Sequence, residues 1–496
     1  MLSRYHLVIL LCYCHHVLAE APSVIIIGAG SAGIAAATRL LENSITNITI
    51  LEAENRIGGR IHSATFCGEV VDLGAEYCYG EKGNIVYDLA KNYNILKSDS
   101  ITLENIVYYS NGSKMDTELS RDFEETIFGY YAPNDDGDNG GTDGMSVGEV
   151  MIDRYKSMLV KKYEHNSTIS EIVKEGLRYA AGNVQLLEGS YSWFDVAADN
   201  DYKELEGAWD LAFQGVGFKT ILNILMKNYP NSSEKLPIDD KIFLNNKVTE
   251  IKWTGNETVT VYTSQNTYTA DFVIFTPSVG VLKHQKTNLF NPNLPSWKND
   301  AIEAFNFGSV AKIFVHFPVQ WWNDSDDYFS FFWRDADLRS IDFPKGPTLD
   351  GLSWITYIQE FGKIGGNVWA AWVSGDLVPE VEKQPSNILK SGVEYVLKKF
   401  LGKVYNVTEI DQVLKTSWAT NDNFKGGYVS VRRGYYRKGW SHQDKLAKPL
   451  KGESERPVLL FAGDATHPFF YSTVHGAIET GYREAERIIK IHNEAK

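Results

Sequence analysis

The segment Val24-Ile25-Ile26-Ile27-Gly28-Ala29-Gly30-Ser31-Ala32-Gly33 decides the fold of this chain. A buried apolar run ends there in a GxGxxG pattern and leads directly into a helix rich in small residues. Gly28 permits a tight turn, Gly30 lets backbone amides approach a pyrophosphate, and Gly33 lets the helix pack closely on the strand. A second apolar strand ends at Glu52, 22 residues after Gly30, where a carboxylate would bind an adenosine ribose. Together these features predict a dinucleotide-binding βαβ unit.

Two arginines narrow the identity of the dinucleotide. Arg56 and Arg60 flank the pair Gly58-Gly59 shortly after the second strand. A nicotinamide cofactor needs no cations at this place, whereas these side chains can grip the second phosphate of an extended FAD. We therefore expect FAD, with contacts from the following residues of the first unit: Gly28, Gly30, Ser31, Ala32, Gly33, Glu52 and Arg60.

At this point the chain resembles the flavin-dependent amine oxidases, whose second strand is followed by a glutamate and then RxGGR. The resemblance covers nearly the whole chain and includes three further blocks: Asp72-Leu73-Gly74-Ala75, Lys312-Ile313-Phe314, and the stretch from Gly463-Asp464 to His475-Gly476-Ala477. Within this family the spacing is most similar to that of the polyamine oxidases.

Length and composition agree with two domains that share a cleft. A chain of 496 residues is too long for a single core. Its 43% hydrophobic and 13% aromatic residues are typical of a globular protein, and its net charge of −14 argues against nucleic-acid binding. The acidity either attracts small cations or only keeps the protein soluble, and both interpretations stay open.

We predict an α/β fold with a discontinuous, Rossmann-like FAD-binding domain and an α+β substrate domain whose mixed sheet is flanked by helices. Residues 20–100, 236–290 and 410–496 are assigned to the first domain, and residues 101–235 and 291–409 to the second. Residues 131–146 are expected to form a polar, glycine-rich loop, and residues 147–235 mainly helices. The stretch Ala311–Phe317 alternates as a strand does.

The N-terminus has the pattern of a signal peptide. Arg4 provides the positive charge, Leu7 to Leu18 form a short apolar core, and small residues permit cleavage after Ala19. We therefore expect a secreted protein, without a later stretch that is long and apolar enough to span a membrane. Glycosylation sequons agree with secretion and occur at Asn47, Asn111, Asn166, Asn231, Asn256, Asn323 and Asn406. Asn47 is expected to lie too close to a strand for modification.

Cysteines and metal ligands contribute little. Only Cys67 and Cys78 remain after removal of the leader, and the extended run between them makes a disulfide doubtful. The chain contains no CxxC motif or histidine cluster that would indicate a metal site.

The resemblance implies further flavin contacts. Val248 matches the position whose backbone contacts the adenine, and Asp464 replaces the family's usual glutamate beside the ribityl chain. The terminal helix begins near Thr473-Val474, and its positive end favours negative charge on the reduced flavin. Members with covalent flavin carry a cysteine before an aromatic residue after a Gly-Gly pair. This chain has Gly426-Gly427-Tyr428 there, so we expect noncovalent FAD.

Lys312 is the expected catalytic residue. Amine oxidation removes a hydride equivalent from the carbon beside nitrogen, which leaves an imine for hydrolysis and a reduced flavin for oxygen. Lys312 matches the family's lysine that holds a water at flavin N5 and assists the reaction with oxygen. The alternative is a strand-edge lysine that reaches solvent.

The resemblance places the substrate pocket around Tyr79, Glu188, Ser190, Tyr428 and Thr473. Tyr428 matches an aromatic residue that flanks the substrate amine, and its usual aromatic partner falls at Thr473. Glu188 aligns with an acid that binds a distal ammonium, and Ser190 assists it. Tyr79 replaces a histidine or glutamate of the family and supplies no neutralising charge, so the identity of the amine stays open.

These features predict an enzyme that oxidises a small cationic amine, most like a polyamine, with FAD and oxygen. The products are an imine and then an aldehyde, a shorter amine and hydrogen peroxide. Two alternatives stay open at this point. A secreted L-amino-acid oxidase would need a cation for the substrate carboxylate, and none occurs at Ala75-Glu76-Tyr77. A catalytically inactive flavin-binding homologue would explain the departures at Tyr79 and Asp464.

Overall fold

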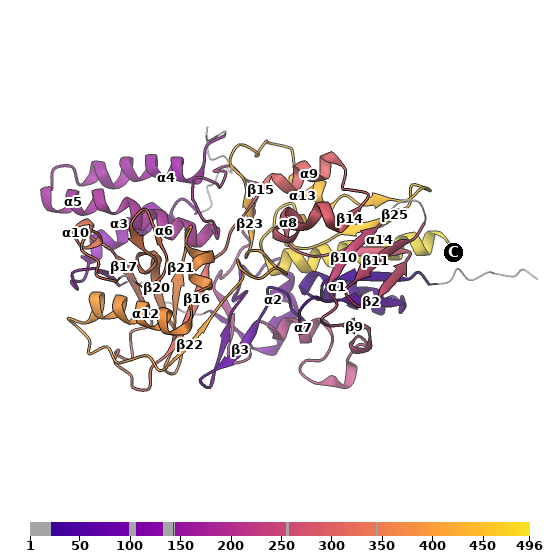
Figure 1. The fold of residues 1–496 in the computed structure, drawn as a ribbon, viewed down its shortest axis with the longest axis horizontal. Coiled ribbons are helices and arrows are strands. Elements are labelled where there is room, and N and C mark those ends of the chain that lie inside the picture. Colours follow the sequence, from indigo (N-terminus) through magenta and orange to yellow (C-terminus); the bar gives the residue numbers. More distant parts are fainter. Residues whose placement is uncertain (1–20, 99–105, 132–141, 143, 254–256, 344) are drawn as a thin grey trace, which may run out of the picture.

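The computed structural model describes residues 21–98, 106–131, 142, 144–253, 257–343 and 345–496. The expected signal peptide, Asn256 and most of the expected polar loop lie outside these residues. The chain folds into two regions that lie side by side along the long axis of the molecule, each around its own sheet (Figure 1). Helices cover the sheets of both regions, so the predicted α/β architecture is confirmed.

The first sheet contains the predicted Rossmann-like unit. Its strands, in spatial order, are β24 (Leu450–Lys451), β25 (Pro457–Phe461), β13 (Phe272–Phe275), β1 (Val24–Ile27), β2 (Ile48–Leu51) and β9 (Ile242–Phe243). All pairs are parallel except β24 with β25. The chain passes from β1 to β2 on one side, whereas β13 and β25 lie on the other. Dinucleotides bind at the carboxyl ends of strands where the order reverses in this way.

Alternation along β1 creates two packed layers. Val24 and Ile26 belong to a core with α1 (Ser31–Glu42) and α14 (Val474–Glu494). Ile25 and Ile27 face the opposite core. That core includes a second, four-stranded sheet made of β12 (Thr267–Ala270), β11 (Val259–Thr263), β10 (Val248–Lys252) and β14 (Phe290–Asn291). The two faces of β1 therefore contribute to the two packed layers of the region.

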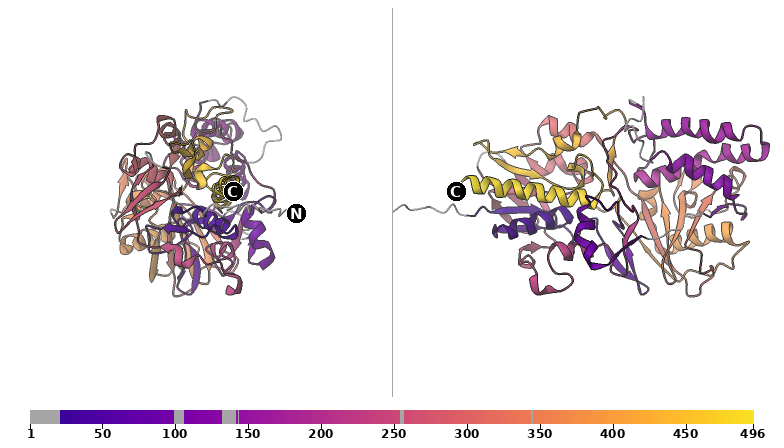
Figure 2. Two further views of the ribbon diagram at one scale, coloured as in Figure 1. Left: turned by 90° about the vertical axis from the view of Figure 1, so that its right-hand side faces the viewer. Right: turned by 180° about the vertical axis from the view of Figure 1, so that it is seen from behind.

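Helices α1 and α14, from opposite ends of the chain, lie side by side (Figures 1 and 2). Gly481 permits this approach, because a Cβ there would lie 2.2 Å from the carbonyl oxygen of Ala32. The small residues of α1 thus serve close packing, and the terminal helix completes the cofactor region.

The second region surrounds a mixed sheet. Its strands, in spatial order, are β22 (Gln412–Lys415), β16 (Ala311–His316), β21 (Val368–Val373), β20 (Ile358–Gly365), β17 (Tyr328–Phe332) and β7 (Val107–Tyr109). Helix α12 (Ser386–Leu401) packs on one face. The other side carries α3 (Thr117–Phe128), α4 (Val147–Tyr155) and α6 (Leu177–Glu188) (Figure 1).

Strand β16 alternates as the sequence predicts. Ile313 and Val315 belong to the core beneath α12. Phe314 lies in a different core, against the hairpin of β3 (Ser63–Phe66) and β4 (Glu69–Asp72). Because Lys312 is on the same side of the strand as Phe314, it points toward the junction of the two regions.

Several domain boundaries differ from the prediction. Helices α7 (Thr220–Leu225) and α9 (Ser296–Glu303), which the sequence assigned to the substrate domain, pack in the cores of the first region. Strand β22 lies within residues 410–496, which the sequence assigned to the FAD-binding domain, yet it pairs with β16 in the second sheet. The chain then forms β23 (Val429–Val431), which pairs with β15 (Phe305–Phe307) before it returns to the first sheet. Strand β22 is short and lacks fully buried residues, so no apolar run marks its sheet in the sequence.

Cys67 and Cys78 are free thiols. In the part of the chain that the structure describes, no helix has the length and apolar character needed to cross a membrane. Within the same residues, no group of three or more histidine, cysteine or acidic side chains is arranged to hold a metal ion.

Candidate active site

The glycine-rich turn after β1 gives its three glycines different environments. Gly28 has a φ of +100°, and a Cβ there would lie 2.5 Å from Thr276 Oγ1. A Cβ at Gly33 would lie 2.0 Å from the carbonyl oxygen of Gly28. At Gly30, by contrast, the nearest atoms would be 3.9 Å away. The fold therefore requires Gly28 and Gly33, whereas Gly30 leaves open the surface that a pyrophosphate would approach.

Glu52 lies just beyond β2 and faces this turn. One of its carboxylate oxygens accepts a hydrogen bond from Ala29 N at 2.7 Å, and the other from Glu54 N at 2.8 Å. Burial raises the pKa of this carboxyl, while the two amides act in the opposite direction. Each oxygen keeps a second lone pair, so the carboxylate can also accept hydrogen bonds from ribose hydroxyls.

Arg60 and Asp464 form an ion pair that connects the turn after β2 with the end of β25. Arg60 also donates to the carbonyl oxygen of Gly427 at 2.6 Å, so a single guanidinium joins three distant segments. The other arginine of the motif, Arg56, donates to the carbonyl groups of Ile57, Gly59 and Ile61. Arg56 therefore supports the turn itself, which differs from the phosphate contact that the sequence indicated.

The remaining predicted cofactor residues lie at the same edge of the first sheet. Ser31 and Ala32 form the first turn of α1 and are buried. Val248 begins β10, two residues after Asn246, whose N–H donates to the carbonyl oxygen of Glu52 at 2.8 Å. The structure thus brings Val248 beside the expected position of the adenosine.

Thr473 caps the terminal helix, which begins at Val474. Its hydroxyl accepts a hydrogen bond from Gly476 N at 3.0 Å and donates to Phe470 O at 2.7 Å. These are the bonds of an N-cap residue, which satisfies backbone groups that the helix leaves free. The hydroxyl is therefore used within the fold, and the contact of Thr473 with substrate stays a prediction.

Lys312 is almost completely enclosed, with 5% of its side chain exposed. Its ammonium group donates to the carbonyl oxygens of Asp72 at 2.9 Å and Gly74 at 3.2 Å, and forms an ion pair with Glu76. It also lies 4.4 Å from the centre of the Trp372 ring. Because an ammonium has three donors, this arrangement uses them all and leaves none for the water that the sequence predicted. The alternative of a solvent-exposed lysine is excluded.

Strand pairing places further polar residues on the face of the sheet that carries Lys312. Lys312 lies opposite Trp372, Trp372 opposite Glu360, and Glu360 opposite Ser330. Residues directly opposite each other on antiparallel strands share a face. Burial raises the pKa of Glu360 to about 7. Neither Glu76 nor Glu360 could be placed at the site from the sequence: the register that brings Glu360 to this face cannot be read from a single strand, and Glu76 meets a partner 236 residues away.

Glu188, at the end of α6, lies among four tyrosines. Tyr131 donates to its carboxylate at 3.0 Å. The other three, Tyr130, Tyr428 and Tyr471, interact with it electrostatically. Burial raises the pKa of the Glu188 carboxyl to about 7, and the Tyr131 hydrogen bond lowers it. A half-buried acidic group among aromatic side chains suits a positively charged ligand.

Two of the predicted pocket residues, Tyr428 and Tyr79, have different surroundings. Tyr428 packs its ring on Gly189, where a Cβ would lie 2.2 Å from the ring, and donates to Leu186 O at 3.1 Å. Tyr79 is 41% exposed, and burial of its hydroxyl raises the pKa of that group. Tyr79 also interacts electrostatically with Glu76, which connects it to the surroundings of Lys312.

Ser190 is fully buried and faces the interior of the fold. Its hydroxyl donates to Ser192 O at 2.7 Å and accepts from Ser192 N at 3.2 Å and Asn306 Nδ2 at 3.1 Å. A hydroxyl has one donor and two acceptor positions, and all of them are occupied. Ser190 therefore stabilises the turn after Glu188, which corrects its predicted contact with substrate.

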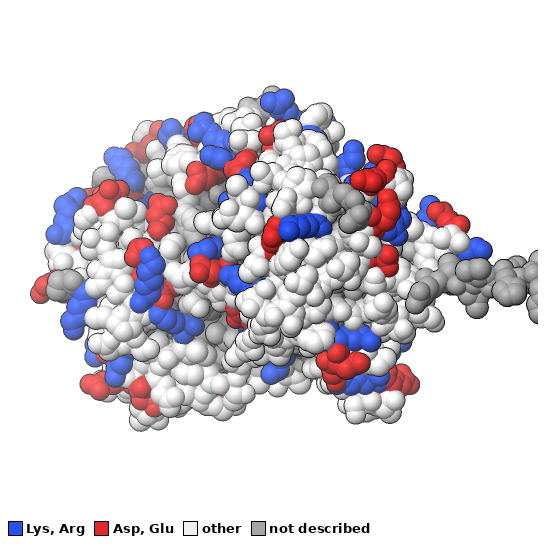
Figure 3. All heavy atoms as spheres, turned by 45° about the vertical axis from the view of Figure 1, so that its right-hand side comes forward, with Lys and Arg blue, Asp and Glu red and all other residues white. Residues whose placement is uncertain are grey.

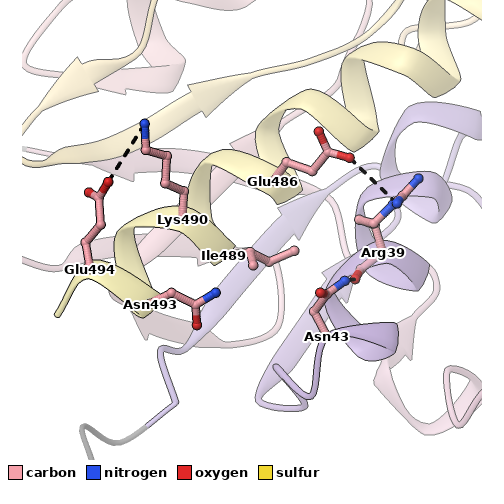
Figure 4. Close-up of a pocket in the computed structure, with 7 residues that line it drawn as sticks. All are labelled: Arg39, Asn43, Glu486, Ile489, Lys490, Asn493 and Glu494. Atoms are coloured by element: carbon pink, nitrogen blue, oxygen red, sulfur yellow. Dashed lines mark hydrogen bonds and ion pairs between the residues drawn. The ribbon is translucent and has the colours of Figure 1, made fainter. Parts of the chain in front are cut away.

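A surface cavity of about 510 Å³ lies between the far ends of α1 and α14 (Figure 4). It is lined by Arg39, Asn43, Glu486, Ile489, Lys490, Asn493 and Glu494. Its charges pair with one another, Arg39 with Glu486 at 3.7 Å and Lys490 with Glu494 at 3.8 Å. Basic and acidic side chains are likewise intermixed on the face in Figure 3. Neither the cavity in Figure 4 nor the face in Figure 3 is assigned to the reaction.

The two sheets, the open glycine turn and the enclosed lysine define an oxidoreductase that binds a dinucleotide. The family model for flavin containing amine oxidoreductases matches residues 31–489. The chain therefore belongs to this family, its cofactor is FAD, and its reaction is FAD-dependent amine oxidation.

Several curated proteins are similar over almost the entire chain. The probable polyamine oxidase 5 of Arabidopsis thaliana is 26% identical over 95% of this chain and 99% of its own. The peroxisomal N(1)-acetyl-spermine/spermidine oxidase of Bos taurus is 26% identical over 95% of both chains. A solved structure of a redesigned putrescine oxidase has a TM-score of 0.60 at 18% identity, over 95% of this chain and 99% of that one. This structural likeness supports the two-region fold.

The residues at the first sheet fit FAD. The open side of Gly30, the free lone pairs of Glu52 and the N-terminus of α1 lie at the edge where the strand order reverses. Asp464, although shorter than the family's glutamate, is held at the end of β25 by Arg60. The ion pair with Arg60 thus fixes the position of the shorter Asp464 carboxylate.

Proposed function

We propose that this amine oxidase acts on a polyamine. The observation that carries the proposal is Glu188, a half-buried carboxylate that lies among tyrosines. An ammonium is the ligand that such a site fits, because both the carboxylate and the ring faces favour positive charge. The names of the similar curated proteins, which refer to polyamines and acetylated polyamines, support the same substrate class. The products would be an imine and then an aldehyde, a shorter amine and hydrogen peroxide.

When bound, FAD supplies the redox chemistry, because it accepts a hydride equivalent from the carbon beside nitrogen. Glu52 and the turn at Gly30 would hold its adenosine and pyrophosphate. Gly427 is followed directly by Tyr428, without the cysteine that covalent members carry before the aromatic residue, which supports noncovalent binding. The N-terminus of α14 would supply a positive dipole end near the flavin.

The substrate would be oriented by groups at its two ends. Glu188 binds a distal ammonium, and the ring of Tyr428 flanks the amine that reacts. Tyr79 adds an aromatic ring without a charge. Lys312 places a buried positive charge at the junction of the two regions, where it assists the reaction with oxygen.

We also propose that the protein is secreted and glycosylated. The pattern of Arg4 and the following apolar residues supports this. In the described residues, Asn111 and Asn231 are exposed, and their side chains accept hydrogen bonds from the serines of their own sequons. Asn47 is exposed too, but it directly precedes β2 and its carbonyl oxygen accepts a hydrogen bond from Val24 N at 2.9 Å, so we expect it to stay unmodified. Expression in a secreting host, followed by peptide mapping with and without glycosidase, tests both parts.

The enzymatic proposal is tested by anaerobic bleaching of the visible flavin absorbance. The purified protein is mixed in turn with spermine, spermidine, N-acetylated polyamines, a monoamine and L-leucine. Bleaching by a polyamine, but not by the monoamine or leucine, is the expected result. Bleaching by leucine alone would instead indicate an amino-acid oxidase. Absence of bleaching by any compound, with flavin present, would contradict the proposal and indicate an inactive homologue.

A further inference from the structure

We propose that Glu76 is a positioning residue for Lys312, which it holds in place and keeps charged. The inference rests on the proposed role of Lys312 in the oxidation. Glu76 precedes β5 (Tyr77–Cys78) in the first half of the chain, and Lys312 belongs to β16 of the second sheet. Their ion pair therefore fastens the junction between the two regions at one buried point.

The geometry fixes the ammonium group in three directions. The carbonyl oxygens of Asp72 and Gly74 take two of its protons, and the Glu76 carboxylate takes the third. The Trp372 ring covers one side. The side chains of the pair are only 5% and 15% exposed, so water offers Lys312 little compensation. Two carbonyl dipoles orient the cation, but only Glu76 in this set neutralises its charge.

Among the described residues, Glu76 is the only titratable side chain that forms a hydrogen bond with Lys312. Asp72 faces Lys312 with its backbone carbonyl, while its carboxylate accepts hydrogen bonds from Ser63 Oγ and Phe218 N. Burial raises the pKa of the Asp72 carboxyl to about 6 and the charge of Lys312 lowers it, so these two groups interact electrostatically without a hydrogen bond between their side chains. Tyr79 is neutral at physiological pH, because burial raises the pKa of its hydroxyl. Trp372 and Thr416, from the neighbouring strands, carry no charge.

The substitution Glu76→Gln tests the charge while it keeps the shape and one hydrogen-bond acceptor. Without its counter-charge, the buried ammonium of Lys312 favours its neutral form as the pH rises. We expect the rate of flavin reoxidation by oxygen to fall about tenfold between pH 7 and 9 in the variant, and to stay nearly level in the wild type. The bound FAD, measured by its absorbance after denaturation, should be unchanged.

Two further variants separate charge from structure. Glu76→Asp keeps the charge, so its pH profile should follow the wild type; the same decline as in Glu76→Gln would overturn the proposal. The double variant Glu76→Gln/Lys312→Met removes both charges, so it should lose less thermal stability than the two single variants lose together. Additive losses of stability would also overturn the pairing.

Failure of this inference can be distinguished from failure of the proposed role of Lys312. If Lys312→Met reoxidises at the wild-type rate, the role of the lysine is wrong, and non-additive stability still reports the pair. If Lys312→Met is slow but Glu76→Gln has a wild-type pH profile, the lysine acts without Glu76 and this inference fails.

Discussion

The glycine turn at Gly28–Gly33 and the wall around Lys312 both bring polar groups to the site, but the chain builds them in different ways. The turn works through missing side chains, within ten residues of one another. The wall joins Glu76, Lys312 and Trp372, which are separated by 60 to more than 200 positions in the sequence. The first can be read from a motif, whereas the second exists only after the two regions have folded together.

Within the turn, one motif combines two kinds of requirement. Gly33 is needed because the backbone of Gly28 occupies the space of a side chain. Gly30 has room for one, so the fold alone does not explain its presence. The difference separates glycines that serve packing from a glycine that serves the cofactor.

Gly33→Val is expected to have the largest effect of any change proposed for the turn. Its Cβ would lie 2.0 Å from a carbonyl oxygen, so β1 and α1 could not pack. We expect a loss of several kcal/mol, of the order found for severe overpacking, and little soluble protein. Soluble yield and the midpoint of thermal unfolding are the measurements.

Gly30→Ala is the matched control. A methyl group has room in the fold, so thermal stability without added FAD should change by less than about 1 kcal/mol. Affinity for FAD should fall at least about tenfold, because the methyl group stands where a pyrophosphate would approach. Equal effects of the two substitutions on stability would show that both glycines serve packing.

Lys312→Met tests the other region and is expected to have the second largest effect. We expect reoxidation of the flavin by oxygen to slow by about 100-fold, since the variant lacks the buried charge beside the site. FAD should remain bound, because the cofactor contacts belong to the first sheet. Stopped-flow absorbance of the reduced enzyme mixed with oxygen measures the rate, and near wild-type reoxidation would remove Lys312 from the mechanism.

Much of the fold could be predicted because its signals are local. The strands at Phe272–Phe275 and Pro457–Phe461 are apolar runs, and β16 shows its alternation within six residues. Resemblance then assigned Lys312 to a site, and the structure places that side chain at the junction of the regions. The boundary near residue 410 could not be predicted, because β22 has no apolar run.

The surroundings of the candidate site were less accessible from sequence. Glu76 was quoted in a motif but had no role, because its partner is 236 residues away. Ser190 was assigned to substrate by its position after Glu188, yet its hydroxyl is used by Ser192 and Asn306. Side-chain direction at the end of a helix depends on the turn that follows, which residue type alone does not determine.

Glu188→Gln tests the residue that we propose binds the distal ammonium of the substrate. In the wild type, the charged fraction of Glu188 grows as the pH rises through about 7, so the KM for a polyamine should fall over that range. The amide carries no charge, so the KM of the variant should be about tenfold higher at pH 8 and nearly independent of pH. Steady-state peroxide production at pH 6, 7 and 8 measures both.

Stability gives an independent check on the same carboxyl. Because burial raises its pKa in the folded protein, the wild type is stabilised by this group at low pH and loses that contribution as the pH rises toward 7. Glu188→Gln should therefore be more stable than the wild type at pH 8 and similar at pH 5. The opposite order would show that Glu188 is paired with a cation in the free enzyme.

Thr473→Ala is expected to have the smallest effect, and it distinguishes a helix cap from a pocket residue. Loss of the cap should cost about 1 kcal/mol of stability and leave the KM for a polyamine within twofold. Thr473→Ser keeps the hydroxyl and should match the wild type in both measurements. If Thr473→Ala instead raised the KM without a loss of stability in urea denaturation, the hydroxyl would belong to the pocket. The end of α14 would then resemble the wall around Lys312, where function depends on side chains, more than the turn at Gly30, where it depends on exposed backbone.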